Sequence, residues 1–262
     1  MLDLIDNLPR GARVLDLGAR SGSFSTARTD VAIVRLDLEI PAARQSGAYV
    51  SGDAALMPFA GAVFDVVISN HSLEHFGELE RTVCEIGRVI RPGGILYVAV
   101  PDATTLTDRI YRWLGKGGGH VNAFRSPEEV TAAIEKGTHL PLCRTTLLYS
   151  SLSFLNAHNF TSRPPRKVAL FGFGNEYFLA VFLHLLRCMD RVLGTRLSVY
   201  GWSFYFGSMD RKAQGEPWPN VCVRCGAGSP VEYLRAADAV RGRTYRCPAC
   251  GGFNLLAPRG RG

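Results

Sequence analysis

The stretch that decides the fold is RVLDLGARSGSF at residues 13–24. An apolar run at 14–17 carries one acid, Asp16, and then enters a turn with glycines at positions 18 and 22. A buried parallel strand that ends in a ligand-binding loop has this pattern. We therefore expect a strand, a glycine turn and a bound ligand at this point of the chain.

Strand-like and helix-like segments alternate after this stretch, which is typical of βαβ units and a parallel sheet. A helical stripe of apolar residues begins at Leu79, and a second helix has Ser126 as its N-cap and Gly137 as its stop. The predicted strands lie at 13–17, 32–36, 48–51, 64–69, 95–100, 143–150 and 197–207.

Two irregular segments, at about 102–126 and 151–196, interrupt the regular pattern, and loops of this kind usually carry specificity. The second contains YFLAVFLHLLRCM at 177–189, within a helix predicted over 177–193. The apolar stretch at 177–189 is too short to span a bilayer and is interrupted by His184 and Arg187. A core helix is the first interpretation, and contact with a membrane interface is the second.

The turn at residues 18–22 excludes two common ligand classes. A phosphate-binding P-loop needs a Lys and a Ser or Thr after its glycines, and that pair is absent. A dinucleotide turn needs a third glycine, and Asp16 would repel a pyrophosphate. A cationic ligand reverses that argument, and S-adenosylmethionine carries both an ammonium and a sulfonium.

At this point the chain resembles the class I S-adenosylmethionine-dependent methyltransferases of the small-molecule, type 11-like kind. Their acid-glycine loop is matched by Asp16, Gly18 and Gly22, and their acids after strands two and three by Asp37 and Asp53. FDVVISNHSLEHF at 64–76 and RPGGILYVAVP at 91–101 continue the series in order. The resemblance covers about residues 10–105.

The resemblance implies a Rossmann-like α/β fold with a doubly wound, seven-stranded, mostly parallel sheet. It also implies S-adenosyl-L-methionine as the cofactor, with Asp37 holding the ribose hydroxyls and Asp53 near the adenine amine. The implied cofactor-binding residues are Asp16, Gly18, Ala19, Gly22, Asp37, Leu38, Asp53, Ala54 and Asn70.

Each acid also has a purely structural interpretation. Asp16 alone could form the turn, Asp37 could cap a helix, and Asp53 could be an ordinary loop acid. Arg20 is a departure, because the family has a glycine there that lets the backbone approach the cofactor. Either its side chain points away and binding survives, which we favour, or the site is blocked and the domain is a non-catalytic scaffold.

Two histidines are candidate catalytic bases for methyl transfer. His71 follows the fourth strand, where the transferable methyl should lie, and it either takes a proton or packs against a ligand. His120 follows three glycines, a composition that suits a lid over the substrate or an ordinary loop. For His75 we expect a structural role at a helix start.

The C-terminal region contains two CxxC pairs separated by 21 residues, which predicts a tetrahedral structural zinc site resembling a zinc ribbon. The predicted ligands are Cys222, Cys225, Cys247 and Cys250. Paired disulfides and a redox site fit less well, because the two motifs mirror each other. A module of this size needs the metal for most of its stability.

The partner of this module is left open by its sequence. Zinc ribbons bind nucleic acid, bind proteins or brace a neighbouring domain, and this one is rich in arginine. RNA methylation is therefore the alternative to our first expectation, in-line methyl transfer to a small molecule or a sugar- or lipid-linked intermediate.

Composition sets the remaining expectations. The 262 residues are 47% hydrophobic and 20% charged with a net charge of +7, which is typical of a globular chain with room for an anionic partner. The acidic N-terminus predicts no export signal, and we expect a cytoplasmic protein with reduced cysteines and no transmembrane segment. The expected domains are 1–207 for methyl transfer, 208–219 as linker, 220–257 as zinc ribbon and 258–262 as basic tail.

Overall fold

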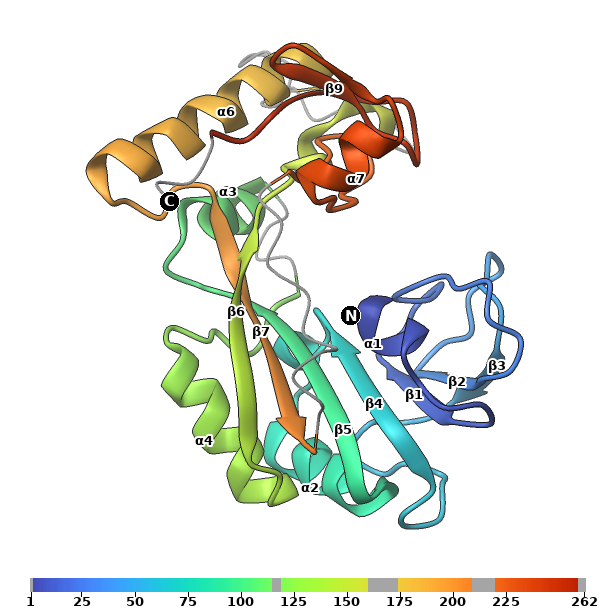
Figure 1. Ribbon diagram of the computed structural model, residues 1–262. Helices are drawn as coiled ribbons and strands as arrows, with labels where there is room; N and C mark the ends of the chain where they lie inside the picture. Colours follow the sequence, from blue (N-terminus) through green and yellow to red (C-terminus); the bar gives the residue numbers. More distant parts are fainter. Residues whose placement is uncertain (1, 115–118, 160–173, 209–219, 259–262) are drawn as a thin grey trace. The chain divides into compact units, whose positions relative to one another are not determined.

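The computed structural model describes residues 2–114, 119–159, 174–208 and 220–258 (Figure 1). These residues form two compact units, which are described separately. The first contains 2–103, 119–146 and 201–208, and the second contains 104–114, 147–159, 174–200 and 220–258. Most of the predicted linker and of the basic tail lies outside the described residues, and the predicted domain bounds stay predictions.

A seven-stranded sheet organises the chain, in the order β3-β2-β1-β4-β5-β7-β6. Neighbouring strands from β3 to β5 are parallel, whereas β7 is antiparallel to β5. The strands are β1 (Arg13–Leu17), β2 (Ala32–Asp37), β3 (Ala48–Ser51), β4 (Phe64–Asn70), β5 (Ile90–Pro101), β6 (Leu142–Tyr149) and β7 (Val199–Gly207). The predicted Rossmann-like, mostly parallel sheet is confirmed.

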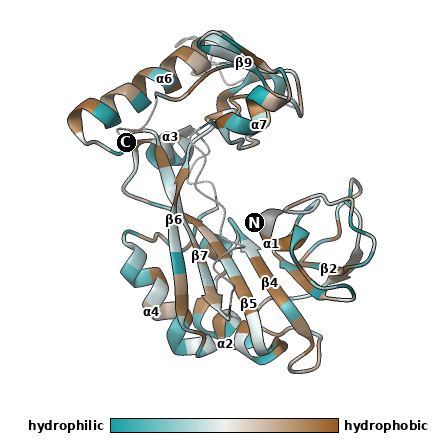
Figure 2. Cartoon of the chain, in the orientation of Figure 1, coloured by the Kyte–Doolittle hydropathy of each residue, from teal (hydrophilic) through white to brown (hydrophobic). Residues whose placement is uncertain are grey.

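The centre of this sheet is the core of the first unit. Val66, Val67 and Ile68 of β4 are almost completely buried, and the middle of β5 is buried in the same way. Both strands carry brown, hydrophobic segments in Figure 2. The chain runs outward in one direction from β1 to β3 and in the other from β4 to β5. In open α/β sheets, ligands bind at the carboxyl ends of the strands where the order reverses. Here that place is the ends of β1 and β4.

Two helices, α2 (Leu79–Val89) and α4 (Pro127–Thr138), pack closely against each other in the first unit. Ser126 caps α4 as predicted, because its Oγ accepts a hydrogen bond from the Glu129 amide at 3.2 Å. Gly137 is not the helix stop that its sequence position predicted. It lies inside α4 against Val83, and His139, with a φ of 57°, is the C-cap.

The alternation of helix and strand that we predicted fails before β4. None of residues 18–63, all of which the structure describes, forms a helix, so β1, β2 and β3 are joined by irregular segments. The first segment, SFSTARTD at 23–30, is rich in residues that favour turns over helices. The second contains Pro41 and Gly47 and is too short for a regular crossover helix.

The second unit combines α3 (Leu106–Leu114) and α6 (Glu176–Leu193) with the cysteine-rich segment. That segment contains α7 (Val231–Ala236), β8 (Val240–Arg241), β9 (Thr244–Arg246) and β10 (Phe253–Leu255). One buried cluster joins the two parts, namely Leu152, Leu155, Leu179, Ala180, Leu183 and Val223. Val223 lies between two of the predicted zinc ligands, so the cysteine-rich segment shares its core with α6.

Candidate functional site

The glycine turn after β1 is shaped by close packing against the segment that follows β4. Gly18 has a φ of 66°, and a Cβ atom added there would lie 2.5 Å from the Cβ of Ser72. Ser72 is held in place because its Oγ donates to the Leu17 carbonyl at 2.9 Å. Only glycine satisfies both the backbone conformation and this contact. The turn therefore brings the end of β1 against the end of β4.

Arg20 fits into the turn with its side chain exposed to solvent. Its backbone has a φ of 45°, an uncommon conformation for a residue with a side chain. The strain is offset by a hydrogen bond of 2.7 Å from the Arg20 amide to Oδ2 of Asp37. The exposed side chain is one part of the first arrangement expected for Arg20, and survival of cofactor binding stays a prediction.

Asp16 is fully buried and forms an ion pair with the guanidinium of Arg35 on β2. Its Oδ2 also accepts a hydrogen bond from the Ser23 amide at 2.9 Å. Burial raises the pKa of Asp16, while the Ser23 hydrogen bond and the Arg35 charge oppose the rise. This buried carboxylate therefore fixes the conformation of the turn through the Ser23 amide.

Arg35 is the residue supporting this turn that the sequence reasoning missed. Its guanidinium donates to the carbonyls of Ser46, at 2.9 Å, and Phe24, at 2.8 Å, as well as to Asp16. It thereby ties both irregular connections to the strand ends. The available signal was a charged residue in the middle of an otherwise apolar strand, which needs a buried partner of opposite charge.

Asp37 and Asp53 lie at the carboxyl ends of neighbouring strands. Asp37 ends β2 and pairs in register with Ser51, the last residue of β3, and Asp53 follows two residues later. Oδ1 of Asp53 accepts a hydrogen bond from the Ala55 amide at 2.8 Å. The parallel pairing therefore brings both predicted acids to one edge of the sheet.

Exposed apolar side chains accompany these acids. Leu38 directly after Asp37 is 69% exposed, and Leu56 after Asp53 is 71% exposed, whereas Ala19 and Ala54 are buried. An adenosine group needs an acceptor for its ribose hydroxyls and an apolar surface for its base. The side chains present at this edge fit the adenosine part of S-adenosylmethionine.

The predicted bases His71 and His120 lie in the same group of side chains. Asn70 ends β4, and His71 follows with a φ of 55° and an amide that donates to the Ala99 carbonyl at 2.9 Å. Burial, together with the positive charges of His120 and His75, lowers the pKa of His71 to about 4. His71 is therefore neutral at physiological pH.

A short segment after the glycine run holds this histidine group together. The amides of Val121 and Asn122 donate to the Glu74 carbonyl at 2.8 and 3.0 Å, and the rings of His75 and His120 have centroids 4.9 Å apart. One ligand atom each from Glu74, His75 and His120 lies within 4.8 Å of the others, a separation that a metal ion could bridge. The proposed lid at 117–120 lies partly outside the described residues.

The four predicted zinc ligands meet in the second unit. Their sulfurs all lie within 4.8 Å of one another, and the Cys222–Cys250 and Cys225–Cys247 pairs are 3.7 Å apart. Four sulfurs at about 2.3 Å from a tetrahedral ion are separated by about 3.8 Å. The donor set and its spacing therefore fit a zinc ion.

Two turns of the same geometry present these sulfurs. The Gly226 amide donates to the Cys222 carbonyl at 2.9 Å, and the Gly251 amide donates to the Cys247 carbonyl at 2.8 Å. Both glycines have a positive φ, 77° and 70°, which permits a tight turn around the sulfurs. Each CxxC pair is thus held in an equivalent loop.

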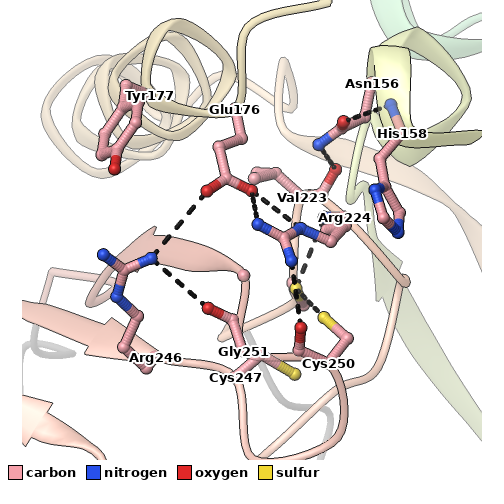
Figure 3. Close-up of polar contacts among 12 residues, drawn as sticks. Asn156, His158, Glu176, Tyr177, Val223, Arg224, Arg246, Cys247, Cys250 and Gly251 are labelled. Atoms are coloured by element: carbon pink, nitrogen blue, oxygen red, sulfur yellow. Dashed lines mark hydrogen bonds and ion pairs between the residues drawn. The ribbon is translucent and has the colours of Figure 1, made fainter.

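Ionic and polar contacts join the cysteine loops to the rest of the second unit (Figure 3). Arg224 donates to Oε2 of Glu176, at the start of α6, through Nε at 2.8 Å and Nη2 at 2.5 Å. The side-chain amide of Asn156 donates through Nδ2 to the Val223 carbonyl at 3.0 Å. Two charged hydrogen bonds from one guanidinium to one carboxylate oxygen therefore tie the start of α6 to the first cysteine loop.

Similar sequences of known activity are methyltransferases. A family model described as a methyltransferase domain matches residues 15–98. The ubiquinone biosynthesis O-methyltransferase of Rhizobium rhizogenes is 28% identical over 162 residues, which are 54% of this chain and 65% of that protein. The malonyl-[acyl-carrier protein] O-methyltransferase of Methylococcus capsulatus is 32% identical over 183 residues, 60% of this chain and 66% of that protein. The chain thus spans less than two thirds of the length of these relatives.

Solved structures share the fold at lower identity. A Bacillus halodurans protein described as a candidate methyltransferase has a TM-score of 0.52 at 20% identity, over 80% of this chain and 97% of that one. A candidate sarcosine dimethylglycine methyltransferase from Galdieria sulphuraria has a TM-score of 0.50 at 18% identity, over 80% of this chain and 83% of that one. The domain match, the relatives and the common fold together support a class I S-adenosylmethionine-dependent methyltransferase.

Proposed function

We propose that this protein transfers a methyl group from S-adenosylmethionine to an oxygen atom of a small molecule or of a lipid-, sugar- or carrier-linked acceptor. The observation that carries the proposal is the placement of Asp37 and Asp53 beside exposed leucines at the carboxyl edge of the sheet. The O-methyltransferase activities of the two relatives add support for an oxygen acceptor.

The residues around the turn divide the binding task. Asp37 would accept hydrogen bonds from both ribose hydroxyls, Asp53 would lie near the adenine amine, and Leu38 would cover the base. Gly18, Gly22 and Ala19 keep the turn narrow, and Asn70 lies at the end of β4. The bound cofactor supplies a methyl carbon activated by a sulfonium, so the protein mainly positions the acceptor in line with it.

The low pKa of His71 restricts the acceptor. A neutral imidazole with a pKa of about 4 is a weak base, because proton transfer is most effective when the pKa of the base is near the working pH. His71 is better suited to orienting an acceptor that is already ionised, such as a carboxylate, than to deprotonating a phenol. His120 lies in the neighbouring segment, and its charge contributes to the low pKa of His71.

The metal site is proposed to be structural. Cys222, Cys225, Cys247 and Cys250 would hold one Zn²⁺ as a closed tetrathiolate, with no position left for an activated water. The metal would stabilise the second unit and would take no part in methyl transfer.

The alternative of RNA methylation has less support from the structure. Arg224 is bound to Glu176, Arg241 donates to both carboxylate oxygens of Asp238 at 2.7 and 2.8 Å, and Arg246 lies over the ring of Phe253. Arg224, at 23% exposure, is thereby less available for a phosphate group, whereas the side chains of Arg241 and Arg246 remain more than half exposed.

Titration calorimetry with S-adenosylmethionine tests the proposed function. Wild type should bind, and Asp37→Asn should lose about 2 kcal/mol or more of binding free energy because a charged acceptor for two hydroxyls becomes neutral. Glu39→Gln, an exposed neighbour on the same segment, is the matched control and should bind like wild type.

The outcome for Arg20 distinguishes the remaining explanations. Binding that is absent in wild type and restored by Arg20→Gly would mean that Arg20 closes the site. Binding that is absent in both proteins would contradict the methyltransferase proposal and favour a non-catalytic scaffold.

A further inference from the structure

The apolar helix α6 contains a buried arginine, Arg187. Among the described helices, α6 included, none is both long and apolar enough to cross a membrane. Arg187 is only 6% exposed, and its Nε and Nη2 atoms are buried without a hydrogen-bond partner among the described residues. Buried polar atoms are nearly always hydrogen-bonded, and buried charges are normally paired. The second unit therefore holds a guanidinium whose charge and donors its own packing does not explain.

The acids of the second unit do not supply the missing charge. Asp190, one turn after Arg187, accepts hydrogen bonds from the amides of Leu197 at 2.6 Å and Ser198 at 2.7 Å, and it forms no ion pair with Arg187. The undescribed parts of this unit contain no acidic side chain. The other acids of the unit are paired with arginines or lie at the surface: Glu176 with Arg224, Asp108 with Arg112, Asp238 with Arg241, and Glu232 exposed.

The two atoms without partners lie on the same edge of the guanidinium. The N–H bonds of Nε and Nη2 run parallel along this edge, which matches the two oxygens of a carboxylate or a phosphate. Burial, opposed by Tyr245 and Tyr149, lowers the pKa of Arg187 to about 10, so the group is still charged at neutral pH. A water molecule could accept one hydrogen bond but would leave this charge unbalanced. The edge therefore favours an anion with two oxygens over a neutral ligand.

Two tyrosines from other elements belong to the same group. Tyr245 on β9 is 2% exposed, and within the described chain its hydroxyl is also buried without a hydrogen-bond partner. Its strand pairs with β10, which packs closely against α6. His184, one turn before Arg187, donates from Nδ1 to the Leu256 carbonyl just after β10 at 3.0 Å, so this side of α6 faces the strands. Tyr149, at the end of β6, is half-buried.

We propose that Arg187 and Tyr245 bind a small oxyanion that presents a carboxylate or a phosphate group. Nε and Nη2 would each donate to one oxygen of the group, and the Tyr245 hydroxyl would donate to an oxygen as well. The anion would bring the negative charge that the acids of the unit do not provide. This proposal concerns the second unit, goes beyond the proposed function and does not depend on it.

Urea denaturation of the full-length protein in inorganic phosphate or in acetate tests this proposal, with chloride as the reference anion at constant ionic strength. A ligand of the folded state raises the free energy of unfolding with its concentration, which gives a dissociation constant. At least one of the two anions should stabilise wild type. Arg187→Met should abolish this effect. Without either anion it should be at least as stable as wild type, because an apolar side chain replaces an unpaired buried charge.

Two conservative variants keep the test independent of a folding defect in Arg187→Met. Arg187→Lys retains the charge but loses the paired donors, and Tyr245→Phe loses only the hydroxyl, so each should weaken binding by about tenfold. Arg191→Met removes an exposed arginine from the same helix, and this matched control should respond to both anions like wild type.

The two probes also identify the ligand group. Stabilisation by acetate alone would assign a carboxylate to the site, and stabilisation by phosphate alone would assign a phosphate. Nitrogen NMR of the Arg187 Nε–H group should show a shift with the same anion in wild type. No stabilisation of wild type by either anion, or an equal effect in Arg187→Met, Arg187→Lys and wild type, would overturn the proposal.

Discussion

Arg20 stands where the resemblance to class I methyltransferases requires a glycine, and its backbone adopts the left-handed conformation that glycine would adopt. The sequence indicated that a side chain occupies a position meant for glycine, but not how the backbone accommodates it. The solution depends on Asp37, 17 residues away, whose carboxylate accepts the Arg20 amide hydrogen bond. The partner of Asp16 could not be predicted from the sequence either. Arg35 is recognised as that partner only once β1 and β2 are paired in register.

The buried ion pair between Arg35 and Asp16 gives a prediction for stability. Arg35→Ala should lower the free energy of unfolding by about 3–5 kcal/mol, because it leaves a buried carboxylate without its counter-charge. Arg81→Ala breaks a surface pair with Glu78 in which both side chains are more than half exposed, and should cost about 1 kcal/mol or less. Urea denaturation measures the free energy of unfolding of both variants. Equal losses would show that the buried ion pair stabilises the protein no more than the surface pair does.

His71 gives a prediction for pH dependence. Its folded pKa of about 4 lies below the ordinary value of 6.5, so the unfolded chain takes up a proton first as the pH falls. Stability should therefore decrease between about pH 6.5 and about pH 4. With 32% of the side chain exposed, we expect a contribution of about 1 kcal/mol at about pH 5.

His71→Gln should remove this contribution and flatten the dependence over that range. The measurement compares urea denaturation of wild type and variant at about pH 7.5 and about pH 5. The same loss of stability in both proteins would show that another group is responsible.

At the scale of elements, Gly137 in α4 is the position where sequence and structure disagree most clearly. Alanine is normally more stable than glycine inside a helix by about 1 kcal/mol. Here a Cβ on residue 137 would lie 2.7 Å from Cγ1 of Val83, so Gly137→Ala should instead destabilise the protein by about 1–3 kcal/mol. Combined with Val83→Ala, the substitution should cost much less, and a double-mutant cycle in urea measures this coupling. Gly137→Ala that stabilises the protein would contradict the observed helix packing.

The strands were predictable because buried parallel strands are short apolar runs that end at polar or glycine residues. The predicted and observed bounds of β1 and β3 agree, and β2 and β4 each extend by one residue to Asp37 and Asn70. The helix-free connections were not predictable in this way. They depend on Arg35, which contacts both of them and takes the place of regular crossover packing.

At the scale of the whole molecule, the cysteine-rich segment is part of a larger unit that includes α6. The sequence indicated the four cysteines and their mirrored turns, since CxxC spacing is a local signal. It did not indicate that Val223 would join the core of α6 or that Arg224 would bind Glu176, because these contacts join segments far apart in the chain.

This arrangement predicts the effect of removing the metal. Chelation should unfold the cysteine loops and also raise hydrogen exchange along α6, because the helix loses both Val223 and the Arg224 ion pair. Exchange at β1 and β4 in the first unit should stay unchanged, and so should the affinity for S-adenosylmethionine. Elemental analysis of freshly purified, reduced protein should give one zinc per chain, and a protein without metal would refute the site.

We propose that the carboxyl edge of β1, β2 and β3 holds S-adenosylmethionine. A crystal structure of the complex with S-adenosylhomocysteine tests it most directly. Both ribose hydroxyls should lie within hydrogen-bond distance of the Asp37 carboxylate. The base should lie against Leu38 with its amine toward Asp53, and the Arg20 side chain should be directed away. A ligand bound elsewhere, or at this edge without contact to Asp37, would contradict it.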